Sequence, residues 1–326
     1  MYKALGIGGV SMRIYNNDIK EKVSKTIIFF LRWVLILSVG YIILFPLFQM
    51  ISQALMTQEQ YTDNSVVWIP KEFSLVNFRV AWSTMDYIKT FAWTILVNII
   101  SAMLQVVTCA FTAYGFSRFN FRGKNIFITL LIFSIIVPSQ MTVIPSYVNF
   151  RNFDILGILR LIGIIIQKDI RPSIIDTPLT FYLPAIFSVG LRSGLVIFIY
   201  MQFFKGLPRE LEEAASIDGA SALKTFLKIV MPSSGVAIVS VFILTVIWYW
   251  NEYFLSVMYF SNNNTLSVRL TNLRMYITNA GIDAEMAVTT GIIKAGALLF
   301  VAPMLLMYLI MQRKFIQSID SVGIVG

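Results

Sequence analysis

The sequence consists of six apolar runs, each about 20 residues long, with polar segments between them. An apolar α-helix of this length crosses the roughly 30 Å hydrocarbon core of a bilayer. The pattern therefore predicts an all-α membrane protein with six transmembrane helices. The expected spans are about 27–50, 91–114, 126–145, 179–204, 236–260 and 290–311.

Nothing resembling a linker rich in serine or glycine interrupts these runs, so we expect one transmembrane domain over 27–311. An N-terminal segment, 1–26, precedes it, and a tail, 312–326, follows it. The first run follows a basic start, as in a secretory signal, but it is too long for a signal core. We therefore interpret it as an uncleaved first span.

Composition supports a membrane protein and excludes several kinds of site. Hydrophobic residues make up 57% of the sequence and charged residues 13%, which leaves too little polar surface to cover a water-soluble globule. Histidine is absent, and Cys109 is the one cysteine. Disulfide frameworks and metal sites built from cysteine and histidine are therefore excluded within this chain.

The distribution of lysine and arginine predicts the orientation. The N-terminal segment, the turn after the second span, the segment after the fourth span and the tail together carry 14 basic residues, against 9 in the three alternate loops. Basic residues concentrate on the cytoplasmic side of membrane proteins. We therefore expect both termini and the segment after the fourth span to face the cytoplasm.

That segment, 205–232, is the longest polar stretch between two spans, and its pattern predicts two short helices joined by a turn. Gly219 suits a left-handed turn, and Ser221 can cap the helix that follows. The second helix has one expected apolar face at i, i+3, i+4 and i+7. This face consists of Leu223, Phe226, Leu227 and Val230.

The sequence offers no machinery for hydrolysing ATP and no catalytic site. A phosphate-binding loop needs Gly-Lys followed by Ser or Thr, but Asn125 follows Gly123 and Lys124. Without histidine, the common nucleophile–base pairs cannot form. We therefore expect a chain that is not an enzyme and binds no cofactor or metal. If ATP drives transport, the ATPase is another polypeptide.

The fifth expected span carries the candidate groups for contact with a solute. Apart from Arg192 and Lys294, which lie near ends or breaks of spans, Glu252 is the ionisable residue well inside a span, and such residues are often functional. Aromatic faces beside an amide and a carboxylate are typical of sugar binding. The alternative is an aromatic belt at the membrane interface. The candidates are Trp248, Tyr249, Asn251 and Glu252.

The spacing within 205–232 resembles the EAA loop of ABC importer permeases. Glu213-Ala214-Ala215 is followed by Gly219, Ile229 and Pro232 at the spacing of that motif. The flanking sequences FFKGLPRELE and IDGA, the turn AYGFSRF and the tail QRKF are similar to the carbohydrate, or maltose-type, branch. These permeases form the binding-protein-dependent transport system inner-membrane component family. The similarity extends from the first span to the C-terminus.

The resemblance implies a type I importer fold, with the sugar path in the spans and alternating access driven by a cytoplasmic ATPase dimer that binds the ATP and Mg²⁺. It also implies a second, homologous permease subunit, an extracytoplasmic solute-binding protein and a bacterial cell membrane location. The residues that it implies for ATPase coupling are Arg209, Glu213, Ala214, Ala215, Asp218, Gly219 and Pro232.

Other functions remain open on the sequence alone. They are an importer subunit of the same architecture for a non-sugar solute, an ion-coupled carrier and a membrane scaffold that does not transport. Two departures from the family pattern affect details. The outer loop 148–178 is longer than usual, which makes it a candidate contact for a binding protein. In maltose-type importers, moreover, the partner permease can hold the sugar.

Overall fold

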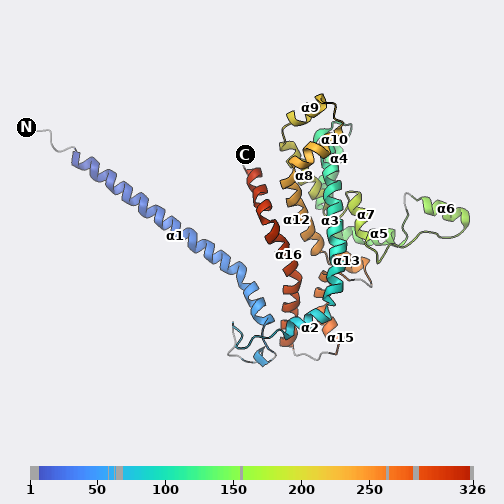
Figure 1. The fold of residues 1–326 in the computed structure, drawn as a ribbon, viewed down its shortest axis with the longest axis horizontal. Coiled ribbons are helices and arrows are strands. Elements are labelled where there is room, and N and C mark those ends of the chain that lie inside the picture. The colour runs from blue at the N-terminus through green and yellow to red at the C-terminus, as the bar shows by residue number, and fades with distance from the viewer. Residues whose placement is uncertain are drawn as a thin grey trace, which may run out of the picture. The chain divides into compact units, whose positions relative to one another are not determined.

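The computed structural model describes residues 7–57, 59–61, 63, 69–154, 157–261, 264–281 and 286–323. All regular elements among these residues are helices, as expected for an all-α protein. The chain divides between Asn77 and Phe78 into two compact units, which are described separately (Figure 1). The ends of the expected terminal segments (1–6 and 324–326) and two residues of the long outer loop (155–156) lie outside the described residues.

The first unit contains α1 (Ile7–Ala54), the one-turn helix η1 (Glu59–Tyr61) and the first residues of α2 (Val76–Thr84). The last carbonyls of a helix have no partner within it. The Asn77 amide supplies one, because Nδ2 donates to the carbonyl oxygens of Ala54 at 3.1 Å and Met56 at 2.9 Å. This side chain fixes the point at which α1 ends.

The second unit is built around α3 (Tyr87–Arg118), which packs against α7 (Leu179–Ile186), α8 (Ser193–Gly206) and α12 (Gly235–Trp250) (Figure 1). Small side chains on α3, among them Ala102, Ala110 and Ala113, are fully buried. In a membrane the hydrophobic effect does not drive helices together, because the lipid tails are themselves apolar. Small residues instead let helix backbones approach closely and gain van der Waals contacts. The small side chains of α3 therefore allow α7, α8 and α12 to pack closely against it.

The remaining helices surround this core. Beyond α12, α16 (Met286–Gly323) packs against α12, α14 (Leu266–Thr271) and α15 (Leu273–Asn279). The short helix α13 (Phe254–Tyr259) contacts α5 (Ser139–Arg151), and α4 (Lys124–Ile136) contacts α8. The polar segment after α8 forms α9 (Glu210–Ile217), α10 (Ala222–Thr225), the π-helix η2 (Phe226–Val230) and α11 (Met231–Ser233).

Within the described residues, three helices are long and apolar enough to cross a membrane: Lys25–Ala54, Tyr87–Arg118 and Thr289–Arg313. The number rises to five if each of two bent pairs is one span, α4 with α5 and α10–α11 with α12, bent by 101° and 79°. Pro138 lies at the first bend, where a proline ring restricts the residue before it. The membrane-protein class is confirmed, and the count of six remains a prediction.

The expected fourth span is not one continuous helix, because it breaks between α7 and α8. Ser188 and Arg192 both have left-handed backbone conformations there, with φ of 57° and 54°. Gly190 lies so close to α3 and α12 that a Cβ atom would be 2.5 Å from Gln105 Oε1 and 2.6 Å from Tyr249 Oη. The glycine and the two left-handed residues end the helical pattern, although the run is apolar enough to span.

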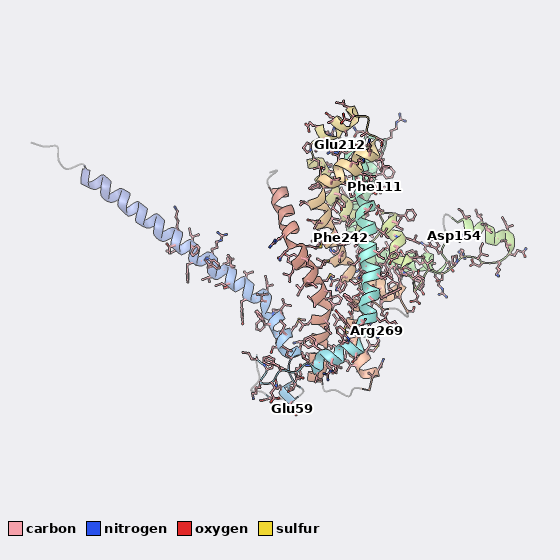
Figure 2. The ribbon with its side chains drawn as sticks, in the orientation of Figure 1. Glu59, Phe111, Asp154, Glu212, Phe242 and Arg269 are labelled. Atoms are coloured by element: carbon pink, nitrogen blue, oxygen red, sulfur yellow. The ribbon has the colours of Figure 1, made fainter. Side chains whose placement is uncertain are left out.

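The long outer loop forms a lobe that contains α6 (Ile158–Ile166) (Figures 1 and 2). Its neck is closed where Phe153 N donates to Pro172 O at 2.9 Å. The Asp154 carboxylate accepts from two backbone N–H groups at the start of α6, Leu159 N at 2.9 Å and Arg160 N at 3.0 Å. The lobe is therefore an ordered insertion with its own helix cap.

We expect Gly190→Ala to destabilise the protein by about 1–3 kcal/mol, because the added methyl group would overlap Gln105 and Tyr249 and force the break to move. The thermal unfolding midpoint of the protein in detergent would measure this. Gly115→Ala is the matched control, since a Cβ atom at Gly115 has no neighbour within 4 Å and alanine favours helix. Equal midpoints for the two variants would contradict the close packing at the break.

Candidate functional site

The polar segment 205–232 lies at one end of the second unit, next to the C-terminal end of α3 (Figure 1). Its two helices and the turn between them are confirmed. Gly219 adopts a left-handed conformation with φ of 74°, and Ser221 Oγ accepts from Lys224 N at 3.4 Å as the cap of α10. Glu210, Glu212 and Glu213 fall in the first turn of α9, where the helix dipole favours negative charge.

The expected single apolar face of the second helix is wrong in part. Phe226 and Val230 are buried, but Leu223 and Leu227 are 57% and 51% exposed. The reason is the π-helical winding of Phe226–Val230, which has more residues per turn than an α-helix and so rotates the two pairs apart. Two leucines therefore remain on the surface of the segment.

Phe226 anchors the segment on α3. Its ring centroid lies 4.5 Å from that of Phe111 and 4.9 Å from that of Tyr114, both on α3. Such aromatic pairs add stability beyond the apolar area that they bury. The second helix is therefore held against the end of the central helix by its buried half.

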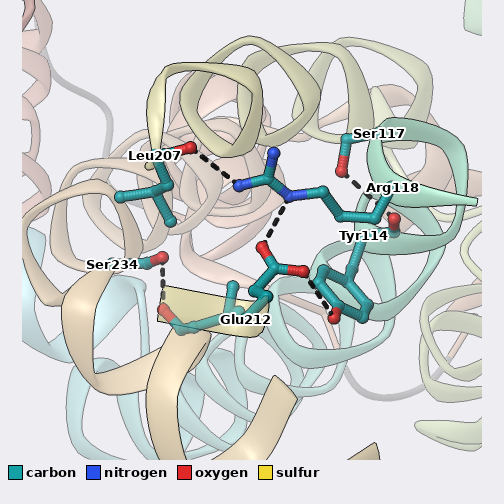
Figure 3. A network of polar contacts seen from close by, with 7 residues as sticks. Tyr114, Ser117, Arg118, Leu207, Glu212 and Ser234 are labelled. Carbon is teal, nitrogen blue, oxygen red and sulfur yellow. Dashed lines mark hydrogen bonds and ion pairs between the residues drawn. The ribbon is translucent and has the colours of Figure 1, made fainter. Parts of the chain in front are cut away.

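A polar network joins α9 to the same end of α3 (Figure 3). Arg118 Nε lies 2.7 Å from Glu212 Oε1, and Tyr114 Oη donates to Glu212 Oε2 at 3.0 Å. Arg118 Nη2 donates to the Leu207 carbonyl oxygen at 2.9 Å, which fixes the end of α8 as well. The side chains of Arg118 and Glu212 are only 7% and 18% exposed. The ion pair is therefore largely shielded from water.

The sequence places Glu213 in the site but does not identify Glu212, its neighbour, as the residue that joins the segment to α3. The signal was present, because Tyr114 and Arg118 belong to the basic turn AYGFSRF, but their partner lies almost 100 residues later, 98 in the case of Tyr114. Most of the residues expected to couple to an ATPase are more exposed than Glu212. Ala215 is buried, and the others are exposed: Arg209, Glu213, Ala214, Asp218, Gly219 and Pro232.

The exposed residues present both charge and apolar surface. Ile217, at the end of α9, is 87% exposed. Together with Leu223 and Leu227 it gives the segment large apolar side chains without neighbours to cover them, among the carboxylates of α9. Chemically, such a surface suits contact with another protein rather than catalysis.

The four residues expected to contact a solute differ in their burial and in their hydrogen-bond partners. Tyr249 is buried in the core, where Oη donates to Gln105 Oε1 at 2.5 Å. Glu252 Oε1 accepts from Leu255 N at 2.9 Å, at the start of α13. The amide of Asn251 is exposed and donates to Ile247 O of its own helix at 2.8 Å. Trp248 is half-buried and lies beside a charged residue that is not among the four candidates.

That residue is Arg192, whose guanidinium carbon lies 5.2 Å from the centroid of the Trp248 ring. The interruption of an apolar run by Gly190, Arg192 and Gly194 was the available signal. Gln105, fully buried in α3, was missed too, although a polar side chain within an apolar span is a signal of the same kind. Within the described residues, no group of histidine, cysteine or acidic residues could hold a metal ion.

The helices and the anchored polar segment define a class, that of helical membrane transport components. The chain belongs to the family described as binding-protein-dependent transport system inner membrane component, whose family model matches residues 105–319. Members are non-catalytic permease subunits of ABC transporters that work with an ATPase and a binding protein.

Three relatives from Bacillus subtilis show how far the similarity extends. The chain is 26% identical to the probable ABC transporter permease protein YurM, over 90% of this chain and 88% of the relative. It is 28% identical to the melibiose/raffinose/stachyose import permease protein MelC, over 81% and 86%. It is 25% identical to the polygalacturonan/rhamnogalacturonan transport system permease protein YtcP, over 77% and 79%.

The fold is also similar to a solved structure. A chain of a bacterial ABC transporter involved in the import of the acidic polysaccharide alginate superposes with a TM-score of 0.65, at 19% sequence identity. The match covers 90% of this chain and 98% of that chain. The fold is therefore that of an ABC importer permease.

We expect Glu212→Gln to weaken the attachment of α9 to α3 by about 3 kcal/mol, because it leaves the largely buried Arg118 guanidinium without a counter-charge. The unfolding of the purified protein by SDS in mixed micelles would measure the loss. Glu213→Gln is the matched control, since it removes the same charge from an exposed position of the same helix. If both variants unfolded alike, the ion pair would not hold the segment.

Proposed function

We propose that this chain is the permease subunit of an ABC importer that carries a sugar or oligosaccharide across a bacterial cell membrane by alternating access. The observation that carries the proposal is the polar segment 205–232, fixed to the central helix by the Arg118–Glu212 ion pair and Phe226. A cytoplasmic motor can move transmembrane helices only through an element that is bound firmly to them.

The segment is the proposed contact for an ATPase dimer that binds the ATP and Mg²⁺, so this chain needs no cofactor of its own. Glu213 and Asp218 offer carboxylates to a cationic groove, and Ala214 allows close approach. The left-handed Gly219 turns the chain between the two helices. Ala215 is buried within the segment, Pro232 is exposed near its end, and Arg209 is a polar anchor at its start.

The nature of the solute is inferred from relatives. Their names include melibiose, raffinose and stachyose import, arabinooligosaccharide transport and trehalose transport. These are saccharides of different size and linkage, so they support a sugar or oligosaccharide without selecting one. Trp248, Asn251 and Glu252 remain candidates for the path, whereas the buried Tyr249 would act by positioning.

The arrangement in the membrane is part of the proposal. Six spans within 27–311, with both termini and 205–232 in the cytoplasm, follow from the apolar runs and from the distribution of basic residues. A second, homologous permease subunit would complete the path, and an extracytoplasmic binding protein would deliver the solute. The lobe that contains α6 is a candidate contact for that binding protein.

We expect Gly219→Asp to leave the protein folded and inserted but to reduce uptake about tenfold or more, which corresponds to about 1.4 kcal/mol of docking free energy. A Cβ atom at Gly219 meets nothing within 4 Å in this chain, and aspartate tolerates a left-handed backbone, so the loss would come from the ATPase interface. Uptake of radiolabelled sugar by proteoliposomes, at equal membrane abundance, would measure it.

The control is Gly281→Asp, at a second left-handed glycine with φ of 69° and open space around it, next to α15 rather than in 205–232. It should transport normally. Normal uptake by Gly219→Asp would remove the coupling role from this segment.

A further inference from the structure

Arg192 is a charged residue placed deep within the apolar part of the fold. It directly precedes α8, whose 14 residues end at Gly206, next to the proposed ATPase contact. At 1.5 Å per residue, Arg192 lies about 21 Å along the helix axis from that end. A distance of this size falls within the roughly 30 Å hydrocarbon core of a bilayer. Arg192 is therefore at the depth of the path rather than at its cytoplasmic mouth.

The guanidinium of Arg192 has few polar partners among the described residues. Its carbon lies 5.2 Å from the centroid of the Trp248 ring, and the side chain is exposed. Among the described residues, no carboxylate lies within 4.0 Å of it and no acceptor receives a hydrogen bond from it. Glu252 attracts it only over a longer distance. Its five N–H donors are therefore available to a ligand.

The backbone beside Arg192 is held rigidly. Leu191 O accepts from Gln105 Nε2 at 2.7 Å, and Leu191 N donates to Tyr249 Oη at 3.3 Å. Gln105 and Tyr249 are themselves buried and joined by a hydrogen bond of 2.5 Å. Two helices, α3 and α12, thus contribute buried polar side chains to fix the residue next to Arg192.

A second set of bonds fixes the start of the break. Thr108 Oγ1 donates to Ala185 O at 2.7 Å, and the hydroxyl groups of Thr112 and Ser188 lie 3.1 Å apart. Non-glycine residues with positive φ, as at Ser188 and Arg192, are strained and cluster at functional sites. The surrounding bonds stabilise a strained loop, and that loop presents an arginine.

The physical chemistry of this arrangement limits what Arg192 can face. A guanidinium in contact with acyl chains costs several kcal/mol, so charged groups at this depth face a water-filled cavity or a protein partner. A guanidinium pairs with a carboxylate through two parallel hydrogen bonds, which a neutral hydroxyl cannot reproduce. The half-buried Trp248 ring and the exposed Asn251 amide, three residues further along the chain, suit the apolar face and the hydroxyl groups of a sugar.

We propose that Arg192 contacts the transported solute and that this solute is an acidic saccharide, an oligosaccharide with uronic acid residues whose carboxylate pairs with the guanidinium. Trp248 packs against a ring of the same saccharide, and Asn251 meets its hydroxyl groups. Gln105 and Tyr249 are positioning residues, which act through the backbone at Leu191. The inference rests on the proposed function, since it selects one class of sugar for the proposed path.

The test is uptake by the complete importer, with the second permease, the ATPase dimer and the binding protein, in proteoliposomes. The probes are oligogalacturonates and oligoglucuronates of two to four residues and the same oligosaccharides with their carboxyl groups reduced to alcohols. The intact importer should take up uronate probes in preference to their reduced counterparts. Arg192→Gln should lower uronate uptake about tenfold or more at limiting solute, because it removes a charge-assisted pair. It should lower uptake of the reduced probes much less, because their alcohol groups form only neutral-acceptor hydrogen bonds with the guanidinium.

Two further variants sharpen the result. Arg192→Lys keeps the charge but not the two-pronged geometry, so uronate uptake should fall to an intermediate level. Arg269→Gln is the matched control, because the Arg269 guanidinium also lies over an aromatic ring, Tyr276 at 4.7 Å, but away from the break. It should not alter the preference for uronates.

The outcomes separate this inference from the proposed function. Uptake of neutral sugars without any uronate would overturn the acidic solute and leave the sugar importer standing. An equal loss of both kinds of probe in Arg192→Gln would overturn direct contact, since a pair between Arg192 and the second permease would affect every solute alike. Uptake of no saccharide, neutral or acidic, would overturn the proposed function itself.

Discussion

A charge that is withdrawn from water needs a partner, and the Arg118–Glu212 ion pair satisfies that requirement where the polar segment meets the central helix. Its two side chains come from segments far apart in the chain, and each would be costly to bury alone. Tyr114 and the Leu207 carbonyl take up further hydrogen-bonding positions of the pair, so the end of α8, the start of α9 and the end of α3 share one network. Displacement of α9 must therefore either break this network or move α3.

The same helix also supplies a hydrogen-bonding partner to buried, uncharged polar groups near its middle. Gln105 satisfies backbone groups at the break between α7 and α8, and it does so from a fully buried position. Because α3 contacts the polar segment at one end and the break near its centre, a movement of the segment would be transmitted along this helix to the break. The proposed alternating access would then have a physical route from the proposed ATPase contact to the residues around Arg192.

Much of this could be predicted from the sequence, and the misses share a cause. The helical class, the turn at Gly219 and the cap at Ser221 depend on neighbours in the sequence, and all were predicted. The role of Glu212, the partners of Gln105 and the burial of Tyr249 depend on residues that only tertiary packing brings together. The π-helical winding of Phe226–Val230 is a fourth case, because the contact of Phe226 with α3 depends on tertiary packing rather than on local preference.

Whether a charged side chain has an ion-pair partner distinguishes charges that stabilise the fold from charges that are available for binding. Arg118 and Glu212 are shielded and paired, which is the condition of groups that hold a fold together. Arg192 is rigidly presented yet has no charge partner within 4.0 Å among the described residues, and Glu213 is exposed on α9. Desolvation disfavours an unpaired guanidinium at this depth, and a strained, hydrogen-bonded loop would be an unnecessary cost if nothing bound to it. Arg192, which has no carboxylate within 4.0 Å among the described residues, is thus the residue that indicates the solute, whereas the paired Arg118 indicates how the segment is coupled to the helices.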